Sequence, residues 1–300
     1  MYNYQSYPCP ICNLTNLKKI FDSTLKEDEL PVIGYDYNNL DQKKTFAYYK
    51  CIDCSHVYAT PRIKNMYQFY IDKQDEQYVK NSDFRRRTYS EVIKILKKFT
   101  NKNNILEYGS GMGDFIYVAE KNNFKCVGIE ISKFSSQISK NLNHEVYQCD
   151  LDQLKNFIGK KKFDVIIMMG VIEHLEYPDR DLKSMDQYLN KDGLIVLWTG
   201  DFNSIYSKIL KKNWWYVIGQ HIQLFTRKSL KKLFQNNSYE LVYNGNLPYI
   251  FHYKHLDLHL KRFFLYRNFL RFIVYFLIKK IKTIKLSLSS EILMVFKKIN

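Results

Sequence analysis

A short apolar run that ends in three closely spaced glycines constrains the fold of this chain most. Residues 105–108 are followed by Gly109, Gly111 and Gly113, and a helix-compatible segment opens at Asp114. Glycines let the backbone turn sharply after a strand and let a ligand approach it closely. The sequence therefore predicts a strand, a ligand-binding turn and a helix in this order.

Strand and helix patterns alternate along the rest of the chain. Short apolar runs separated by helix-length segments are strand candidates at residues 104–108, 126–130, 163–168, 193–199, 239–243 and 292–296. This alternation predicts an α/β fold with a parallel sheet that carries helices on both faces. Upstream, residues 90–99 have apolar side chains at helical spacing, and residues 45–49 form a further strand candidate.

An acidic residue, Glu130, ends the second of these strands, 23 residues after Glu107. A carboxylate at this place accepts hydrogen bonds from a ribose diol in dinucleotide-binding folds. The third glycine comes two residues after the second instead of three, which departs from the pyrophosphate pattern and favours a nucleoside ligand without a pyrophosphate. The alternative is a plain strand-to-helix turn followed by a surface glutamate.

Five motifs in one order resemble class I S-adenosylmethionine-dependent methyltransferases. They are ILEYGSGMG, VGIEIS, QCDL, FDVIIMMGVIEHL and DGLIVLWTG, and the resemblance covers about residues 90–245 and the terminal strand at 292–296. It implies a Rossmann-like, seven-stranded sheet whose last strand is antiparallel. It also implies S-adenosyl-L-methionine as the cofactor.

The same resemblance implies a set of cofactor-binding residues. Those at the glycine turn would line the methionine and sulfonium end, and the acid after the next strand would hold the ribose. Residues after the second and third strands would contact the adenine, and one after the fourth would approach the sulfonium. The set is Glu107, Gly109, Gly111, Gly113, Glu130, Ile131, Asp150, Leu151 and Gly170.

Four cysteines form two C-x-x-C pairs, Cys9 with Cys12 and Cys51 with Cys54, with 38 residues between the pairs. Each pair places two thiolates on one tight turn, and two such turns predict a closed, structural Zn²⁺ site. Redox chemistry at a C-x-x-C pair is the alternative. Outside this set we expect a bystander role for His56 and core positions for Cys126 and Cys149.

The N-terminal part looks like the zinc-knuckle module of bacterial methyltransferases from sugar and cell-surface polysaccharide pathways, through the C-x-x-C-x-x-V-x-x-x-P ending at residues 51–61. We therefore expect a zinc-knuckle module at residues 1–70 and a methyltransferase domain at residues 71–300. Deoxysugar C-methyltransferases of similar design carry a further C-terminal domain, whereas this chain ends at its seventh predicted strand. The resemblance thus favours O-methylation.

Two histidines follow predicted strands on the side of the sheet where ligands bind, His174 and His221. Transfer of a methyl group to a hydroxyl requires loss of a proton, and histidine has a suitable pKa. Both are candidate catalytic residues, and the alternative for His174 is to cap a helix or pack beneath the cofactor. Trp214 and Trp215 suit either a cover over a sugar or cofactor, or the core.

The charge of the chain is concentrated near its end. The net charge is +16, and residues 251–300 hold 11 Lys and Arg against 2 Asp and Glu. Residues 247–286 form an aromatic and basic segment that predicts a helical insertion, amphipathic over 254–285. It could serve as a lid, contact an anionic membrane surface or simply pack on the domain. We expect residues 85–87, three arginines, to form a solvated helix face.

The sequence has no secretory signal pattern, and no apolar run of ~18 residues, as a membrane-spanning helix would require. We therefore expect a cytoplasmic protein, with peripheral contact at the inner face of the membrane as an option.

The motifs predict methyl transfer from S-adenosyl-L-methionine. The resemblance of the N-terminal part implies that the acceptor is a hydroxyl of a small molecule or glycan, such as a nucleotide- or lipid-linked sugar in surface polysaccharide synthesis. An RNA base methyltransferase is the enzyme alternative, which the concentration of charge in an apolar segment disfavours. A non-catalytic, membrane-associated scaffold is the other alternative. The glycine turn and Glu130 argue against it.

Overall fold

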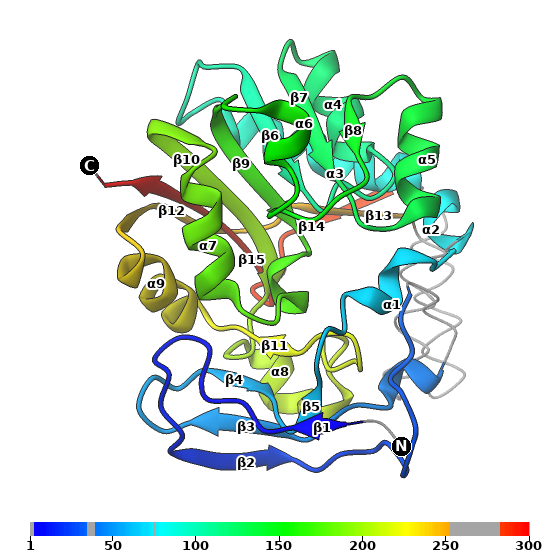
Figure 1. Cartoon of the computed structure of the whole chain (residues 1–300), viewed down its shortest axis with the longest axis vertical. Coiled ribbons are helices and arrows are strands. Elements are labelled where there is room, and N and C mark those ends of the chain that lie inside the picture. Colours follow the sequence, from blue (N-terminus) through cyan, green and yellow to red (C-terminus); the bar gives the residue numbers. More distant parts are fainter. Residues whose placement is uncertain (1–2, 35–39, 75, 253–282, 300) are drawn as a thin grey trace.

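A seven-stranded sheet forms the centre of the computed structural model, which describes residues 3–34, 40–74, 76–252 and 283–299 (Figure 1). The strand order is β12-β15-β10-β9-β6-β7-β8. In chain order these strands are β6 Asn104–Tyr108, β7 Lys125–Ile129, β8 Val146–Tyr147, β9 Phe163–Met169, β10 Leu189–Gly200, β12 Tyr239–Asn246 and β15 Glu291–Lys298.

Strand direction within the sheet follows the predicted pattern. β15 pairs antiparallel with both β10 and β12, and the strands from β10 to β8 pair in parallel. All seven residues of β9 are buried, because helices cover both faces of the sheet at its centre. The prediction of a seven-stranded α/β sheet with an antiparallel last strand is confirmed.

Helices form a layer on each face of this sheet. α3 (Ser82–Leu96) and α4 (Asp114–Lys121) bury their apolar side chains against one face, and α7 (Pro178–Asp186) and α9 (Arg227–Asn236) against the other. The remaining helices have nine residues or fewer. They are α1 Gln68–Ile71, α2 Glu76–Lys80, α5 Lys133–Asn141, α6 Lys155–Ile158 and α8 Ile205–Leu210, with 3₁₀ turns η1 Leu40–Lys43, η2 Ile172–His174 and η3 Lys211–Asn213.

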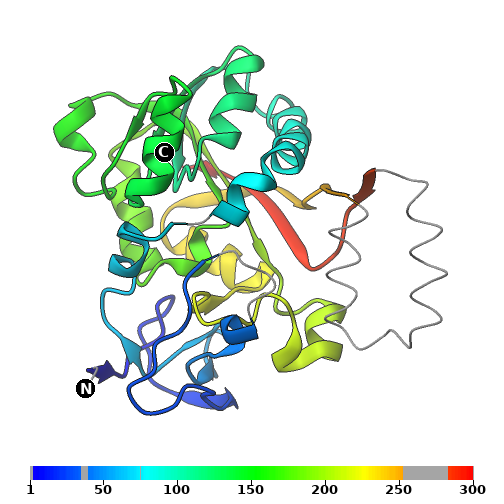
Figure 2. The same ribbon diagram turned by 90° about the vertical axis from the view of Figure 1, so that its right-hand side faces the viewer.

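The N-terminal residues form a small separate layer beside one end of the sheet (Figure 2). β2 (Leu17–Phe21), β3 (Tyr48–Cys51) and β4 (Val57–Ala59) make an antiparallel sheet, and β11 (Gln223–Leu224) pairs with β4 as its edge strand. A second pair joins β1 (Tyr4–Gln5) to β5 (Arg62–Ile63). β11 lies between β10 and α9 in the chain, so main-chain hydrogen bonds tie the N-terminal sheet to the segment that follows β10.

The ends of the predicted helical insertion are strands. β13 (Tyr249–His252) and β14 (Thr283–Leu286) pair antiparallel, since their β-branched and aromatic residues suit an extended hairpin. The segment between them, which holds nearly all of the predicted amphipathic region, lies outside the described residues. Among those that are described, no helix has the length and apolar character needed to cross a membrane.

The segment upstream of the large sheet contains the expected helical region. The residues at helical spacing from residue 90 onward form the later part of α3, which begins at Ser82, and Val92, Ile93 and Leu96 are among its buried residues. The strand expected at residues 45–49 runs over Tyr48–Cys51, so its predicted start was three residues too early.

The arginine run in α3 is another correction. Arg85 and Arg86 both form ion pairs with Asp114 at the start of α4, at 2.5 and 2.8 Å. Their side chains are 11% and 28% exposed, whereas Arg87 is half exposed and pairs with Asp83. The run therefore fastens α3 to α4 through two of its members, and only the third is solvated as expected.

Candidate functional site

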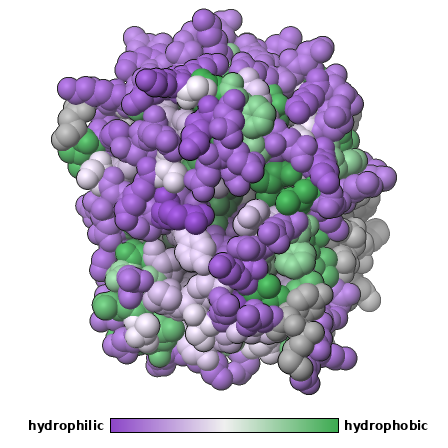
Figure 3. Space-filling model, viewed as in Figure 1, coloured by the Kyte–Doolittle hydropathy of each residue, from purple (hydrophilic) through white to green (hydrophobic). Residues whose placement is uncertain are grey.

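A cavity of about 520 Å³ lies at the carboxyl ends of the parallel strands. Its inner wall consists of residues that follow β6, β7, β8 and β9, and residues between β5 and α3 close its outer side. The face seen in Figure 3 is largely hydrophilic and is hollowed between the large sheet and the N-terminal layer. Ligands of doubly wound sheets bind at this edge, and the volume suits a small ligand.

The turn after β6 has the backbone conformation for which its glycines are suited. Gly109, Gly111 and Gly113 have φ angles of +72°, +51° and +81°. A Cβ atom on Gly109 would lie 2.6 Å from Val171 Cγ2, so the turn packs directly against the loop after β9. Gly109 and Gly111 line the cavity, whereas Gly113 is the N-cap of α4.

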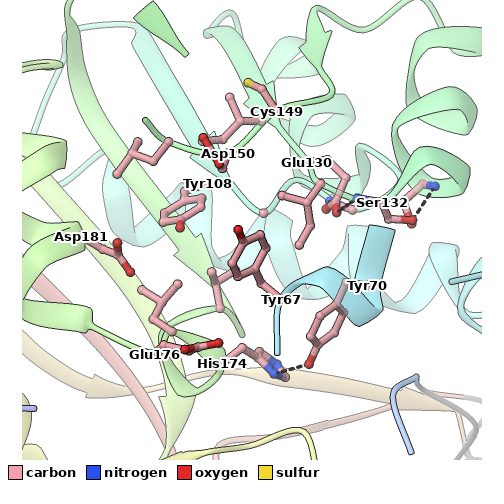
Figure 4. Close-up of a pocket in the computed structure, with 18 of the residues that line it drawn as sticks. Tyr67, Tyr70, Tyr108, Glu130, Ser132, Cys149, Asp150, His174, Glu176 and Asp181 are labelled. Carbon is pink, nitrogen blue, oxygen red and sulfur yellow. Dashed lines mark hydrogen bonds between the residues drawn. The ribbon is translucent and has the colours of Figure 1, made fainter. Parts of the chain in front are cut away.

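Glu130 follows β7, and the backbone holds its carboxylate in place. Oε2 accepts a hydrogen bond from Gly111 N at 2.7 Å, and Oε1 accepts one from Ser132 N at 2.8 Å. Burial raises the pKa of Glu130, and these two bonds oppose that shift. Glu130 and Ile131 both line the cavity (Figure 4). The carboxylate keeps lone pairs free to accept further hydrogen bonds.

Three more of the predicted residues line the same cavity. Asp150 Oδ1 accepts a hydrogen bond from Gln153 N at 2.9 Å, which fixes the turn after β8. Gly170 has φ +72°, and a Cβ there would lie 3.3 Å from the Trp198 ring. The structure thus brings together Gly109, Gly111, Glu130, Ile131, Asp150, Leu151 and Gly170.

Glu107, which was also predicted to bind the cofactor, does not line the cavity. It is 2% exposed and, like Gly113, is not among the described residues that line the cavity. Burial raises its pKa well above the usual range, and the charges of Asp114 and Glu130 add to that shift. Its Oε2 has no hydrogen-bond partner within the described part of the chain. Glu107 is therefore a buried group behind the cavity wall and not part of its lining.

The two candidate catalytic histidines lie side by side. The ring centroids of His174 and His221 are 4.8 Å apart, and His174 lines the cavity. His174 Nδ1 lies 3.0 Å from the Gln220 carbonyl oxygen and 2.8 Å from Tyr70 Oη, and His221 Nδ1 lies 2.9 Å from the Tyr216 carbonyl oxygen. A carbonyl oxygen can only accept, so Nδ1 carries the proton in both rings.

Burial keeps both imidazoles uncharged at neutral pH. It lowers the pKa of His174 to about 4 and the pKa of His221 well below its usual range. Glu173, directly before His174, is 2% exposed, and burial raises its pKa to about 8. One donor atom from each of these three side chains lies within 4.8 Å of the other two. The sequence offered no signal that singled out Glu173.

Tyrosines form much of the cavity lining that the sequence did not predict. Tyr67 and Tyr70 come from the segment between β5 and α3, and Tyr108 ends β6 (Figure 4). Tyr78 of α2 and Tyr177, which precedes α7, also line the cavity. The chain has 25 tyrosines, so their residue type carried no signal. Only the tertiary structure brings these rings to one place.

A buried ion pair attaches the N-terminal layer to the cavity wall. Arg62 Nη1 lies 3.3 Å from Glu176 Oε2, with side chains 2% and 7% exposed. Glu176 Oε1 also accepts a hydrogen bond from Met66 N, and the Arg62 guanidinium stacks on Tyr7 at 3.9 Å. Glu176 lines the cavity, so the position of this wall depends on the N-terminal layer.

The four paired cysteines meet at one point of that layer. The Sγ atoms of Cys9 and Cys54 are 3.3 Å apart and those of Cys12 and Cys51 are 3.5 Å apart, and all four lie within 4.8 Å of one another. Thiolates around tetrahedral Zn²⁺ are separated by about 3.8 Å at Zn–S bonds of about 2.3 Å. No disulfide joins them. The donor set therefore fits a closed zinc site.

Other predicted residues take core or supporting positions. His56 is fully buried and bonds Gln223 Oε1 through Nε2 at 2.8 Å, outside the cysteine cluster, as expected. Cys126 and Cys149 are each 5% exposed, and Trp214 is 1% exposed in the core. Trp215 donates from Nε1 to Glu291 at 3.0 Å. Neither tryptophan is among the described residues that line the cavity.

Comparison with known proteins agrees with this architecture. The sequence profile of a family described as a methyltransferase domain matches residues 81–244. That match spans more than half of the chain, and the chain belongs to this family. Among curated proteins, no significant match was found.

Solved structures share the fold at low sequence identity. An S-adenosylmethionine-dependent methyltransferase from Archaeoglobus fulgidus is 16% identical with a TM-score of 0.52, covering 75% of this chain and 100% of that one. A possible histamine N-methyltransferase from Thermotoga maritima is 18% identical with a TM-score of 0.50, covering 74% and 94%. The plantazolicin methyltransferase BpumL in complex with S-adenosylhomocysteine is 18% identical, also at 0.50, covering 75% and 90%. The chain thus belongs to the methyltransferase-domain family and has the fold of class I S-adenosylmethionine-dependent methyltransferases.

Proposed function

We propose that this protein transfers the methyl group of S-adenosyl-L-methionine to a hydroxyl of a sugar or glycan precursor. The observation that carries the proposal is the convergence of the glycine turn, Glu130, Asp150 and Gly170 on one cavity. The sugar acceptor is inferred from the zinc-knuckle module, and the tyrosine-rich outer wall supports it because aromatic faces suit sugar rings.

The cofactor would bind along the inner wall. Glu130 would accept both hydrogen bonds of the ribose diol, since backbone donors already fix its carboxylate. Ile131 and Leu151 would contact the adenine, and Asp150 would lie at its edge. Glu107 and Gly113 would act from behind, by shaping the glycine turn that holds the methionine end. The bound cofactor supplies an electrophilic methyl group on a sulfonium.

The acceptor would enter from the side of Tyr67 and Tyr70. Its hydroxyl must lie about 3 Å from the methyl carbon, in line with the bond that breaks, and must lose its proton. His174 and His221 are the proposed catalytic residues at this place. Because the pKa of His174 is about 4, this imidazole is a weak proton acceptor on its own. A second factor is needed to acidify the acceptor hydroxyl.

The N-terminal layer would be a structural module. We propose residues 1–70 as a zinc-knuckle unit, with Cys9, Cys12, Cys51 and Cys54 holding Zn²⁺, and residues 71–300 as the methyltransferase unit. Four thiolates leave no open position on the metal, so its role is to fold the module. The proposal places the enzyme in the cytoplasm or at the inner face of the membrane, where reducing conditions preserve the thiolates.

Isothermal titration calorimetry with S-adenosylmethionine and S-adenosylhomocysteine tests the cofactor. We expect Glu130→Ala to weaken binding by about 10–100-fold, through loss of hydrogen bonds to a charged acceptor. Glu145→Ala is the matched control, because this exposed acid directly precedes β8 and its carboxylate makes surface contacts with Lys161 and Tyr147. Equal affinity in wild type and Glu130→Ala would overturn the assignment of Glu130.

Transfer of a labelled methyl group tests the acceptor. We expect label in nucleotide-sugar or lipid-linked sugar fractions, with the methyl group resistant to treatments that cleave esters. Label in RNA instead would favour the base-methylating alternative. Binding of the cofactor without transfer to either class would contradict a sugar acceptor.

A further inference from the structure

We propose that Glu173, His174 and His221 hold a divalent cation of the zinc class, placed to bind the hydroxyl of the acceptor. This second metal site is separate from the cysteine cluster. The identity of the acceptor rests on the proposed function. The cation site itself is inferred from the positions and burial of the three side chains.

The three donors form a cluster of the composition that such cations prefer. Imidazole and carboxylate together suit Zn²⁺ and other divalent transition metals, and two histidines with one glutamate leave coordination positions open for a substrate. Donors around one such cation lie about 3–4 Å apart. One donor atom from each of the three side chains lies within 4.8 Å of the other two, close to that arrangement.

The hydrogen bonds of both rings fix the tautomer that a metal ligand needs. Nδ1–H of His174 is bonded to the Gln220 carbonyl and Nδ1–H of His221 to the Tyr216 carbonyl. Each Nε2 therefore carries a lone pair. Histidine ligands in metal sites almost always donate their other N–H to a carbonyl or carboxylate in this way.

The buried carboxyl group of Glu173 is an independent indication that a cation binds here. It is 2% exposed, yet its Oε2 has no hydrogen-bond partner within the described part of the chain. A buried carboxyl oxygen without a partner is costly, and a cation, which binds the ionised form, would satisfy it.

The position beside Gly170 connects this cluster to the chemistry. A Cβ atom on Gly170 would lie 3.7 Å from Glu173 Oε1, and both Gly170 and His174 line the cavity. The cation would bind the hydroxyl oxygen of the acceptor and lower its pKa, so that the proton leaves to water. That oxygen then forms a bond to the methyl carbon while the carbon–sulfur bond breaks, and the electron pair stays on sulfur as S-adenosylhomocysteine.

Titration of the full-length, zinc-loaded protein with Co²⁺ tests the site. We expect one further equivalent of metal with visible ligand-field absorption and without the thiolate-to-cobalt charge-transfer band of a cysteine site. Glu173→Gln and His174→Asn should weaken uptake of this equivalent by at least about tenfold. Glu145→Gln, an exposed acid outside the cluster, should leave it unchanged.

Two results would overturn the proposal. One is cobalt uptake by the wild type that always carries the thiolate band, which means replacement of zinc in the cysteine cluster. The other is unchanged cobalt affinity in both variants. The wild-type spectrum decides the question even where a variant fails to fold.

Calorimetry with S-adenosylhomocysteine on the same proteins separates this proposal from the proposed function. If cobalt binds the cluster and the cofactor product does not bind, the cation site stands and the methyltransferase function fails. If the cofactor product binds and cobalt does not enter the cluster, the function stands and the cation site fails.

Discussion

Buried polar side chains have different surroundings in the cysteine cluster and at the cavity. In the cluster, four sulfur atoms from two distant turns face one another and form a complete ligand set. At the cavity, Glu173 Oε2 has no hydrogen-bond partner among the described residues, and burial raises the pKa values of Glu173 and Asp181 to about 8 and about 7. The first arrangement favours stability, and the second keeps groups available for a ligand. Removal of a cysteine ligand should therefore destabilise the protein, whereas neutral replacement of a buried cavity carboxyl group should stabilise it.

The largest effect is expected at the cysteine cluster. Cys51→Ser removes one of four zinc ligands, and we expect loss of the metal with a fall in unfolding free energy of more than about 5 kcal/mol, because metal binding and folding of such modules are coupled. Metal analysis and thermal denaturation measure both changes. Cys126→Ser is the control, since this core cysteine lies outside the cluster. It should keep the zinc, and equal behaviour of the two variants would contradict a structural zinc site.

The next effect concerns the ion pair that joins the two regions. Arg62→Met leaves the buried Glu176 carboxylate without its cation, and we expect a loss of about 3–5 kcal/mol in unfolding free energy. Adding Glu176→Gln should restore part of this loss, because the uncompensated charge is then gone. Denaturant titration of the single and double variants measures the coupling. Purely additive effects would mean that the pair does not act as a unit.

A change of opposite sign is expected at Asp181. Its pKa is about 7 in the folded chain, because burial disfavours the charged form, and near 3.8 when unfolded. Between these values the folded state binds more protons than the unfolded state, so stability falls as pH rises from about 4 to 7 and then stays level. Asp181→Asn removes that loss and should stabilise the ligand-free protein by about 2–4 kcal/mol at pH 8.

Denaturation of wild type and Asp181→Asn at pH 4 and pH 8 provides the check on this prediction. The two proteins should differ little at pH 4 and most at pH 8. A difference that does not change with pH would show that the carboxyl group of Asp181 is not buried in its protonated form.

The smallest effect is expected from Tyr70→Phe. Removal of the hydroxyl takes away its contact with His174 Nδ1, whereas the Gln220 carbonyl still accepts from the same nitrogen. We expect less than about 1 kcal/mol in stability and unchanged affinity for S-adenosylhomocysteine. Methyl transfer should slow by a few-fold, through looser placement of the ring. A loss of cofactor affinity would instead place Tyr70 against the cofactor.

Much of the cavity's inner wall could be predicted from local patterns. Glu130 and Gly170 follow directly after buried strands, and the carboxyl ends of parallel strands meet at one edge of a sheet. The glycine turn is equally local, because its φ angles depend on residue type. The cysteine cluster could also be predicted, since each pair lies on one short turn.

The outer wall could not be predicted in this way. Tyr70 and His174 are 104 residues apart, and Arg62 and Glu176 are 114 apart. No periodicity connects such pairs, because their contact depends on how the N-terminal layer docks on the sheet. The arginine run of α3 was misjudged for the same reason, since Asp114 lies on another element.

The sequence by itself determined the order of strands and helices, the glycine turn, the acid that follows it and the pairing of cysteines. Each of these depends on residues close together in the chain, where backbone preference and hydrophobic period act directly. Tertiary structure alone decided that Glu107 is buried behind the wall, that β11 completes the N-terminal sheet and that Glu173 meets both histidines. These outcomes depend on packing between distant segments, whose geometry is fixed only when the whole core is formed.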